Sequence, residues 1–317
     1  MVVAVDKSSR IFVAGHRGLV GGAIRRHLEA SGHTSLVLRT HQELDLLNRA
    51  RVDTFFAEFQ PEYVFLAAAK VGGIMANQTM PAEFIFENLA VQINVIDAAY
   101  RHGARKLQFL GSSCIYPRLA AQPIREEYLL SGLLEPTNDA YAVAKIAGIK
   151  MVQAYRSQYG FDGISLMPCN LYGPGDNFDL TNCHVLPALM RKMHEAKMRG
   201  APDVVIWGTG SPLREFLHVD DLASAAVYLM RNYSSDQIVN VGTGSEISIR
   251  DLARTIQHVV GYQGRVVHDT SKPDGTPRKL LDVSRLNALG WHSSISLEEG
   301  IRQTYEWYLR SAHVQGQ

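Results

Sequence analysis

The stretch that decides the fold is Ile11-Phe-Val-Ala14, followed directly by Gly15-His-Arg-Gly18-Leu-Val-Gly21. The apolar run predicts a buried strand, and apolar residues at helical spacing from Val20 to Leu28 predict a helix that Gly32 ends. Glycines at such a junction let the chain turn sharply and let an anion approach the helix N-terminus without meeting a Cβ atom. Because the motif follows the first strand, it indicates a dinucleotide site. The expected cofactor contacts in this loop are Gly15, His16, Arg17, Gly18, Leu19, Val20 and Gly21.

Outward from this motif, strand and helix continue to alternate. Apolar strands are expected at 36–38, 63–67, 107–110 and 164–167, with helices over 81–100 and 140–159. Apolar strands that alternate with helices are typical of a parallel sheet covered on both faces. We therefore predict an α/β fold: a doubly wound parallel sheet (Rossmann) with a smaller mixed C-terminal domain.

The chain is expected to leave this sheet and return to it. After Pro168 the sequence becomes rich in Gly and Asn, and the segments 216–219 and 238–241 suggest a return to the sheet. We assign 1–172 and 215–245 to the cofactor-binding domain. The interleaved segments 173–214 and 246–317 are assigned to the second domain, which we expect to bind the substrate.

Composition excludes several classes of protein. The 317 residues are 46% hydrophobic and carry a formal net charge of +1, so a disordered chain and a basic nucleic-acid binder are both disfavoured. No apolar run approaches a membrane span. The three cysteines Cys114, Cys169 and Cys183 show neither disulfide nor zinc-site spacing. We expect a cytoplasmic protein without a metal, a membrane partner or a nucleic-acid partner.

The end of the second strand bears on the choice of cofactor. A carboxylate there would bind the ribose 2′-hydroxyl of NAD, but this chain reads Leu38-Arg39-Thr40-His41. Arg17 and Arg39 instead offer positive charge for a 2′-phosphate. The sequence therefore favours NADP(H), although solvated surface arginines remain an alternative reading.

A tyrosine and a lysine lie one helical turn apart in Tyr141-Ala-Val-Ala-Lys145. An adjacent ammonium is expected to lower the pKa of the Tyr141 phenol and make it a usable general acid beside a carbonyl. Ser112, after the expected strand 107–110, could donate a second hydrogen bond to the same oxygen. Together these three residues predict carbonyl reduction.

These features resemble the extended short-chain dehydrogenase/reductase family, and the resemblance covers essentially the whole chain. It implies that the second domain binds a nucleotide-sugar and that Arg214 contacts its diphosphate. Four segments (14–21, 67–73, 111–117 and 272–279) resemble the branch of that family that acts on GDP-4-keto-6-deoxy-D-mannose. The implied reaction is epimerisation at C3 and C5, then reduction at C4 by NADPH to give GDP-L-fucose.

The resemblance also implies roles for individual residues. Cys114 would be the base and His184 the opposing acid, and a nearby imidazolium would raise the thiolate fraction of Cys114. From the residues alone, Cys114 could equally be a small buried apolar residue. The implied cofactor contacts are Arg39, Leu110, Gly111, Ser112, Ser113, Lys145, Pro168, Cys169, Asn170, Leu171 and His184. The implied substrate contacts are Lys192, Trp207, Arg214 and Asp274. Some relatives carry Arg at the position of His41, a difference that could weaken the grip on a 2′-phosphate.

Two other functions stay open. One is a nucleotide-sugar 4-epimerase using NAD(P), which needs no side-chain base at C3 or C5. The other is a redox sensor that binds NADP(H) without turnover. Apolar residues also surround more than one face of the expected helix 81–100. This surplus and the habit of the family suggest a homodimer; the residues are Phe84, Ile85, Phe86, Leu89, Val91, Ile93, Val95 and Ile96.

Overall fold

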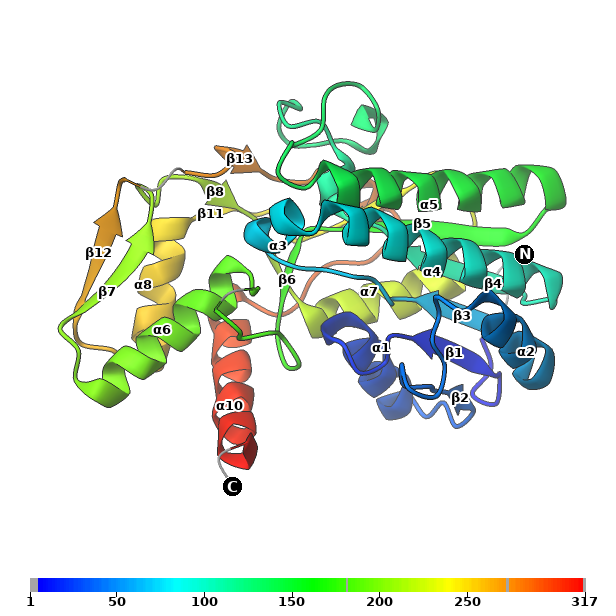
Figure 1. Cartoon of the computed structure of the whole chain (residues 1–317), viewed down its shortest axis with the longest axis horizontal. Coiled ribbons are helices and arrows are strands. Elements are labelled where there is room, and N and C mark those ends of the chain that lie inside the picture. Colours follow the sequence, from blue (N-terminus) through cyan, green and yellow to red (C-terminus); the bar gives the residue numbers. More distant parts are fainter. Residues whose placement is uncertain (1–4, 181, 272–273, 316–317) are drawn as a thin grey trace.

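The computed structural model describes residues 5–180, 182–271 and 274–315. Its centre is a six-stranded sheet in the order β10-β5-β4-β3-β1-β2, in which every pair of neighbours is parallel (Figure 1). The strands are β1 (Ile11–Ala14), β2 (Leu36–Val37), β3 (Tyr63–Leu66), β4 (Lys106–Leu110), β5 (Asp162–Pro168) and β10 (Val239–Val241). The predicted doubly wound parallel sheet is confirmed. Its strand order reverses beside β1, where such sheets bind ligands at the carboxyl ends of the strands.

Helices cover both faces of this sheet. On one face α2 packs on α4 and α4 on α5, and on the other face α1 packs on α7. Figure 1 shows α4 and α5 side by side above the sheet, with α1 and α7 below it. The bounds are α1 (Leu19–Ala30), α2 (Arg49–Phe59), α3 (Ile74–Thr79), α4 (Pro81–Arg101), α5 (Asp139–Tyr159) and α7 (Val219–Asn232).

A smaller unit lies beyond the carboxyl ends of the large sheet (Figure 1). It holds short ladders: β6 (Asn170–Tyr172) with β9 (Phe216–His218), β7 (Asp203–Trp207) with β12 (Arg265–Asp269), and β8 (Leu213–Arg214) between β11 (Ile247–Ser248) and β13 (Arg278–Lys279). The remaining helices are α6 (Val185–Arg199), α8 (Ile249–Val260), α9 (Ser284–Ala288) and α10 (Leu297–Gln315). A separate hydrophobic core, which includes Met190, Ile256 and Ile301, holds α6, α8 and α10 together.

One strand expected in the large sheet lies elsewhere. The segment 216–219 was expected to return to that sheet, but β9 pairs with β6 outside it, and β10 alone makes the return beside β5. A short apolar run identifies a strand without identifying its partner. The domain boundaries stay a prediction, which must also accommodate Leu281, Leu286 and Trp291 in the larger core.

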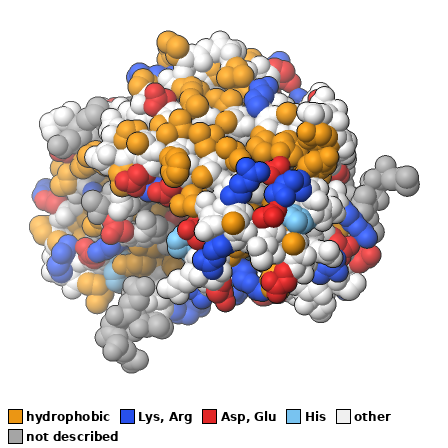
Figure 2. All heavy atoms as spheres, turned by 45° about the vertical axis from the view of Figure 1, so that its right-hand side comes forward, with side chains coloured by type: hydrophobic (Ala, Val, Ile, Leu, Met, Phe, Trp, Pro, Cys, Tyr) orange, Lys and Arg blue, Asp and Glu red, His pale blue; other side chains and the backbone are white. Residues whose placement is uncertain are grey.

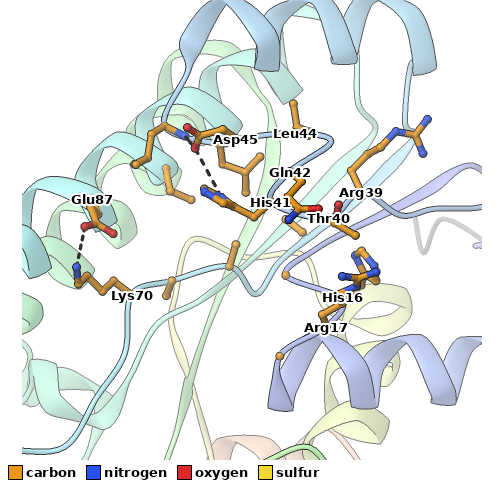
Figure 3. Close-up of a pocket in the computed structure, with 18 of the residues that line it drawn as sticks. His16, Arg17, Arg39, Thr40, His41, Gln42, Leu44, Asp45, Lys70 and Glu87 are labelled. Atoms are coloured by element: carbon orange, nitrogen blue, oxygen red, sulfur yellow. Dashed lines mark hydrogen bonds and ion pairs between the residues drawn. The ribbon is translucent and has the colours of Figure 1, made fainter. Parts of the chain in front are cut away.

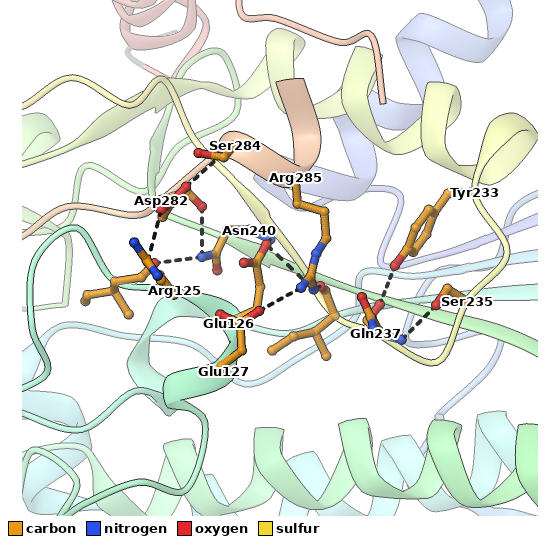
Figure 4. Close-up of polar contacts among 12 residues, drawn as sticks. Arg125, Glu126, Glu127, Tyr233, Ser235, Gln237, Asn240, Asp282, Ser284 and Arg285 are labelled. Atoms are coloured by element: carbon orange, nitrogen blue, oxygen red, sulfur yellow. Dashed lines mark hydrogen bonds and ion pairs between the residues drawn. The ribbon is translucent and has the colours of Figure 1, made fainter. Parts of the chain in front are cut away.

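A polar cluster of buried and half-buried side chains, which we call the anchor network, fastens the loop that follows β4. It consists of Tyr116, Glu126, Asn240, Asp282 and Arg285 (Figure 4 shows all but Tyr116). Asn240 Oδ1 accepts from the Tyr116 hydroxyl (2.6 Å), and Asn240 Nδ2 donates to the carbonyls of Ile124 (2.9 Å) and Asp282 (3.1 Å). The Asn240 N–H donates to Glu126 Oε1 (3.0 Å). The loop is therefore held between β10 and the segment that leads into α9.

Candidate active site

The glycine loop is as tight as its sequence predicts. Gly15 has φ +84°, and a Cβ atom there would lie 2.9 Å from the backbone of Ala68. A Cβ on Gly21 would lie 2.2 Å from the carbonyl oxygen of Gly15, which also accepts from the Gly18 N–H at 2.9 Å. No larger residue fits at these two positions without moving backbone. The loop thus leaves the first turn of α1 open to an anionic group such as a pyrophosphate.

A cavity of about 680 Å³ lies beside this loop (Figure 3). Of the expected cofactor contacts, Gly15, His16, Arg17, Gly18 and Arg39 line it, whereas Leu19, Val20 and Gly21 lead into α1. We had not predicted the lining from the loop after β2 or from the end of β3 and α4. These residues are Thr40, Gln42, Leu44, Asp45, Leu46, Leu47, Ala68, Ala69, Lys70, Glu87 and Val91. Their places after successive parallel strands were the signal that could have identified them.

Two arginines give this cavity positive charge. Arg17 is exposed at the glycine loop. The Arg39 guanidinium lies 4.3 Å from the ring centroid of Phe59 and donates to the Leu38 carbonyl at 2.8 Å. His41 Nδ1 lies 3.8 Å from Asp45 Oδ1, so the histidine faces a carboxylate at the same rim.

Tyr141, Lys145 and Ser112 come together where β4 ends. Lys145 Nζ donates to the carbonyl of Leu110 (2.7 Å) and lies 5.7 Å from the ring centroid of Tyr141. Burial lowers the pKa of Lys145 to about 7. Burial, and then the charge of Cys114, raise the pKa of Tyr141, while a hydrogen bond with Ser112 opposes them. The expected lowering of the Tyr141 pKa is therefore not found: burial dominates, and the net shift is upward.

Cys114 lies on the same rim, in the short 3₁₀ turn Ser113–Ile115. Ser112 Oγ caps this turn by accepting from the Cys114 N–H (3.2 Å). Two donors approach the Cys114 sulfur: Asn138 Nδ2 at 3.3 Å and Lys279 Nζ at 3.6 Å. An ammonium and an amide N–H are both donors, and a sulfur atom can accept from them. The sequence did not identify Asn138 or Lys279 as site residues.

His184 opens helix α6 and shares Lys279 with the thiol. Its loop is held on Gly73, whose N–H donates to the Asn182 carbonyl (3.0 Å). The His184 side chain keeps contact with solvent, yet burial lowers its pKa, and the charge of Lys279 adds to that effect. The positive charge found beside Cys114 is that of Lys279, and the lowered pKa of His184 disfavours the imidazolium that the sequence led us to expect.

The remaining expected cofactor contacts lie where β4 and β5 end. The Gly111 N–H donates to the Leu166 carbonyl at 2.8 Å, and a Cβ there would overlap Met167. Leu110 precedes this position and Ser113 follows it by two residues, and Pro168, Cys169, Asn170 and Leu171 lead from β5 into β6. Cys169 is buried, and burial raises the pKa of its thiol well above the ordinary value.

The four expected substrate contacts lie around the ends of β7 and β8 in the smaller unit. The side chain of Trp207 is 60% exposed, and Lys192 Nζ lies 5.9 Å from its ring centroid. Asp274 accepts from the N–H (2.9 Å) and the hydroxyl (2.7 Å) of Thr209. A Cβ on Gly275 would lie 3.1 Å from Arg214 Nη2. An indole face, two cations and a carboxylate suit a nucleoside diphosphate.

The described residues offer neither a metal site nor a membrane-spanning helix. In residues 5–180, 182–271 and 274–315, no group of three His, Cys, Asp or Glu side chains is placed to hold a metal ion. Within the same ranges, no helix has the length and apolar character needed to cross a bilayer.

Comparison with known proteins agrees with this geometry. The chain is 62% identical to "GDP-L-fucose synthase 1" of Arabidopsis thaliana over 306 residues, which cover 96% of this chain and 95% of that protein. It is 57% identical to the GDP-L-fucose synthase of Escherichia coli K12, covering 95% and 97% of the two chains. A solved GDP-mannoheptose C4 reductase from Campylobacter jejuni with NADP bound superposes with a TM-score of 0.90 at 42% identity, covering 96% and 100%.

The family assignment follows from a match along most of the chain. The model of the NAD dependent epimerase/dehydratase family matches residues 11–242, from β1 to just beyond β10. This match confirms the resemblance to extended short-chain dehydrogenases/reductases. The chain belongs to the NAD dependent epimerase/dehydratase family.

Proposed function

We propose that this chain has GDP-L-fucose synthase activity: it epimerises GDP-4-keto-6-deoxy-D-mannose at C3 and C5 and then reduces C4 with NADPH. The similarity to curated GDP-L-fucose synthases carries the identity of the reaction. The observation that carries the chemistry is the Cys114 sulfur, held by Asn138 and Lys279 beside Ser112 and Tyr141.

The epimerisation needs a base, hydrogen-bond donors to the ketone oxygen, and an acid. The hydrogens on C3 and C5 flank the C4 ketone, so the Cys114 thiolate takes either proton while the electron pair moves to the ketone oxygen. Tyr141 and Ser112 donate to that oxygen. His184 then returns a proton to the opposite face, and the negative enolate favours its protonated form. Exchange with solvent resets both groups, so solvent hydrogen enters at C3 and C5.

The reduction uses the same two side chains, Tyr141 and Ser112, beside the C4 oxygen. Bound NADPH supplies the hydride to C4. Tyr141 gives its proton to the C4 oxygen as that oxygen becomes a hydroxyl, and Ser112 holds the oxygen in line. Lys145, fixed by the Leu110 carbonyl, offers positive charge to the phenolate that remains. Its lowered pKa fits a group that exchanges protons near neutral pH.

Two features support NADP(H) as the cofactor. The Gly15 and Gly21 cradle, which a Cβ would fill, leaves room for a pyrophosphate at α1. Arg17 and Arg39 line the same cavity and suit a 2′-phosphate. We expect kcat/KM for NADPH to exceed that for NADH, and an Arg17→Ala variant to lose most of that preference. Equal values for the two cofactors in the wild type would refute it.

The rival functions leave part of this site without a role. A 4-epimerase has no use for a thiolate held by an ammonium, and a redox sensor has none for a Tyr141, Ser112 and Lys145 set. The deciding test mixes the purified protein with NADPH and GDP-4-keto-6-deoxy-D-mannose and identifies the product by NMR. GDP-L-fucose with one NADPH consumed per product supports the proposal. An unchanged sugar, or a product that keeps the 3,5-configuration, overturns it.

We also propose a homodimer formed through α4 and α5. Phe86, Ile93 and Val143 on these helices are 67%, 45% and 44% exposed. Figure 2 shows hydrophobic side chains gathered over this part of the surface. The test is the mass in solution by light scattering: a dimer that Phe86→Arg converts to a monomer supports the interface, whereas a wild-type monomer refutes it.

The cytoplasm is the compartment that suits this chemistry. A thiol base works only while it is reduced, and the reducing cytosol keeps thiols in that state. Cys114, Cys169 and Cys183 are all free in the structure. Fractionation of the native host would test this placement, and recovery of the activity outside the cytoplasm would contradict it.

A further inference from the structure

Asn138 stands at a position that normally caps a helix, but it does not cap one. It is the residue before α5 (Asp139–Tyr159), and asparagine is favoured there because its side-chain oxygen accepts an N–H of the first turn. The Asn138 side chain makes no such bond. Its Nδ2 lies 3.3 Å from Cys114 Sγ instead, and its Oδ1 is buried without a hydrogen-bond partner among the described residues.

A buried amide oxygen without a partner costs stability, so its presence at a candidate active site calls for a role in another state of the protein. The Cys114 sulfur beside this amide has two protonation states, a thiolate and a thiol. A thiolate accepts hydrogen bonds, and a thiol also donates one through its S–H. An asparagine amide carries both donors and an acceptor, and rotation about χ2 exchanges their places.

We propose that Asn138 is a positioning residue that holds the Cys114 sulfur in both protonation states of the epimerisation. Its Nδ2 donates to the thiolate before the proton is taken from the sugar carbon. Once that C–H bond has broken and the S–H bond has formed, the amide turns and Oδ1 accepts from the thiol. This inference rests on the proposed function, in which Cys114 is the base.

Other groups around the sulfur do not make Asn138 redundant. Lys279, from β13, donates to Sγ at 3.6 Å and has no acceptor for an S–H. Tyr141, from α5, lies in the same site, where the charge of Cys114 raises the pKa of the Tyr141 phenol. Of the two side chains that donate to the sulfur, Asn138 and Lys279, the Asn138 amide is the one that also offers an unused acceptor.

The test is the pH dependence of Cys114 alkylation, which requires no substrate. In a Cys183→Ser background, iodoacetamide labelling of the Cys114 peptide is followed by mass spectrometry, since Cys169 is buried. We compare Asn138 with Asn138→Leu, which keeps the size without the polar atoms, and with Asn138→Asp, which keeps the shape and adds a negative charge. Thr137→Val is the matched control, because the Thr137 hydroxyl bonds to Glu135 and not to Cys114.

We expect the Asn138→Leu profile to move to higher pH by about one unit, the effect of losing one charge-assisted hydrogen bond. The Asn138→Asp profile should move further, and the Thr137→Val profile should not move. Deuterium entry at C3 and C5 should fall by about tenfold in Asn138→Leu, while the affinity for NADPH stays unchanged.

An Asn138→Leu profile that overlays the wild type overturns the proposal, whether or not the protein makes GDP-L-fucose. If Asn138→Leu does not fold, Asn138→Asp decides by the same measurement. A wild type that makes no GDP-L-fucose but shows the shifted profiles would refute the proposed function alone.

Discussion

The anchor network around Asn240 and the reacting centre, by which we mean Cys114 with Ser112, Asn138, Tyr141, Lys145 and Lys279, both involve the loop that follows β4, and both bury polar side chains. In the anchor network both side-chain polar atoms of Asn240 are hydrogen bonded within the protein. In the reacting centre the Oδ1 atom of Asn138 has no such partner, and the lowered pKa of Lys145 and the raised pKa of Tyr141 both reflect burial.

This difference in hydrogen bonding distinguishes residues that stabilise the fold from residues that take part in the reaction. Satisfied polar groups hold a loop in one place, because breaking any bond leaves a buried group without a partner. Groups that are incompletely satisfied cost stability, but they remain available for a substrate. We therefore expect substitutions in the anchor network to lower stability, and substitutions in the reacting centre to lower the rate.

The largest effect is expected from Tyr141→Phe. Loss of the phenolic proton should reduce the rate of C4 reduction by about a hundredfold to ten-thousandfold, the range for a general acid. The free energy of unfolding should change by only about 1 kcal/mol, since one hydrogen bond is lost. Single-turnover oxidation of NADPH and urea unfolding measure the two quantities. A full rate in this variant would remove Tyr141 from the mechanism.

Asn240→Leu should have the opposite effect: it should lower the free energy of unfolding and leave the reaction rate nearly unchanged. It removes the Asn240 partners of the Tyr116 hydroxyl and the Asp282 carbonyl, while the Ile124 carbonyl keeps only the Asp282 N–H, and we expect a loss of about 3–5 kcal/mol in the free energy of unfolding. The rate of the folded fraction should stay close to that of the wild type. Ser235→Ala, a half-buried loop residue drawn beside the network in Figure 4, should change stability by less than about 1 kcal/mol, since its hydroxyl bonds within its own loop. Equal losses in the two variants would contradict the role of the network.

Lys279→Met should slow deuterium entry at C3 and C5 by about tenfold to a hundredfold, because the thiolate loses a charged donor. The same change removes one of the two causes that lower the pKa of His184, so this pKa should rise toward its ordinary value of 6.5. NMR titration of the His184 ring measures the rise. Lys150→Met, whose lysine bonds only to Gln153 on the surface, is the control. An unchanged His184 titration would show that Lys279 does not act on both groups.

The smallest effect is expected from His41, at the edge of the cavity beside the glycine loop. In His41→Arg, the new guanidinium should lower the KM for NADPH by about twofold to fivefold, as expected of an exposed charge pair. The KM for NADH should stay the same, since NADH has no 2′-phosphate. Steady-state kinetics with both cofactors measures the difference, and an equal change for both would place His41 away from the phosphate.

The sequence predicted the local features of this protein well. The strand, glycine turn and helix at 11–30 form a contiguous unit, so periodicity and turn chemistry are enough to identify them. The Tyr141 and Lys145 pair is equally local. The pairing of β9 with β6 is set by contacts across the smaller unit, and no pattern within 216–219 encodes it.

The environment of the thiol was beyond sequence reasoning for the same reason. Lys279 is 165 positions from Cys114 and Asn138 is 24 positions away, and neither residue type is unusual in its segment. The raised pKa of Tyr141 likewise depends on burial, which is a property of the assembled protein. Family resemblance implied roles for Cys114 and His184, whereas the contacts of Asn138 and Lys279 with the Cys114 sulfur emerged only from the fold.

The most direct test of the account is solvent exchange in Cys114→Ala. The variant and the wild type are incubated with GDP-4-keto-6-deoxy-D-mannose in deuterated water without NADPH, and deuterium at C3 and C5 is followed by NMR. We predict that exchange is abolished in Cys114→Ala while NADPH binding is retained. Deuterium entering at the wild-type rate would show that another group removes the proton.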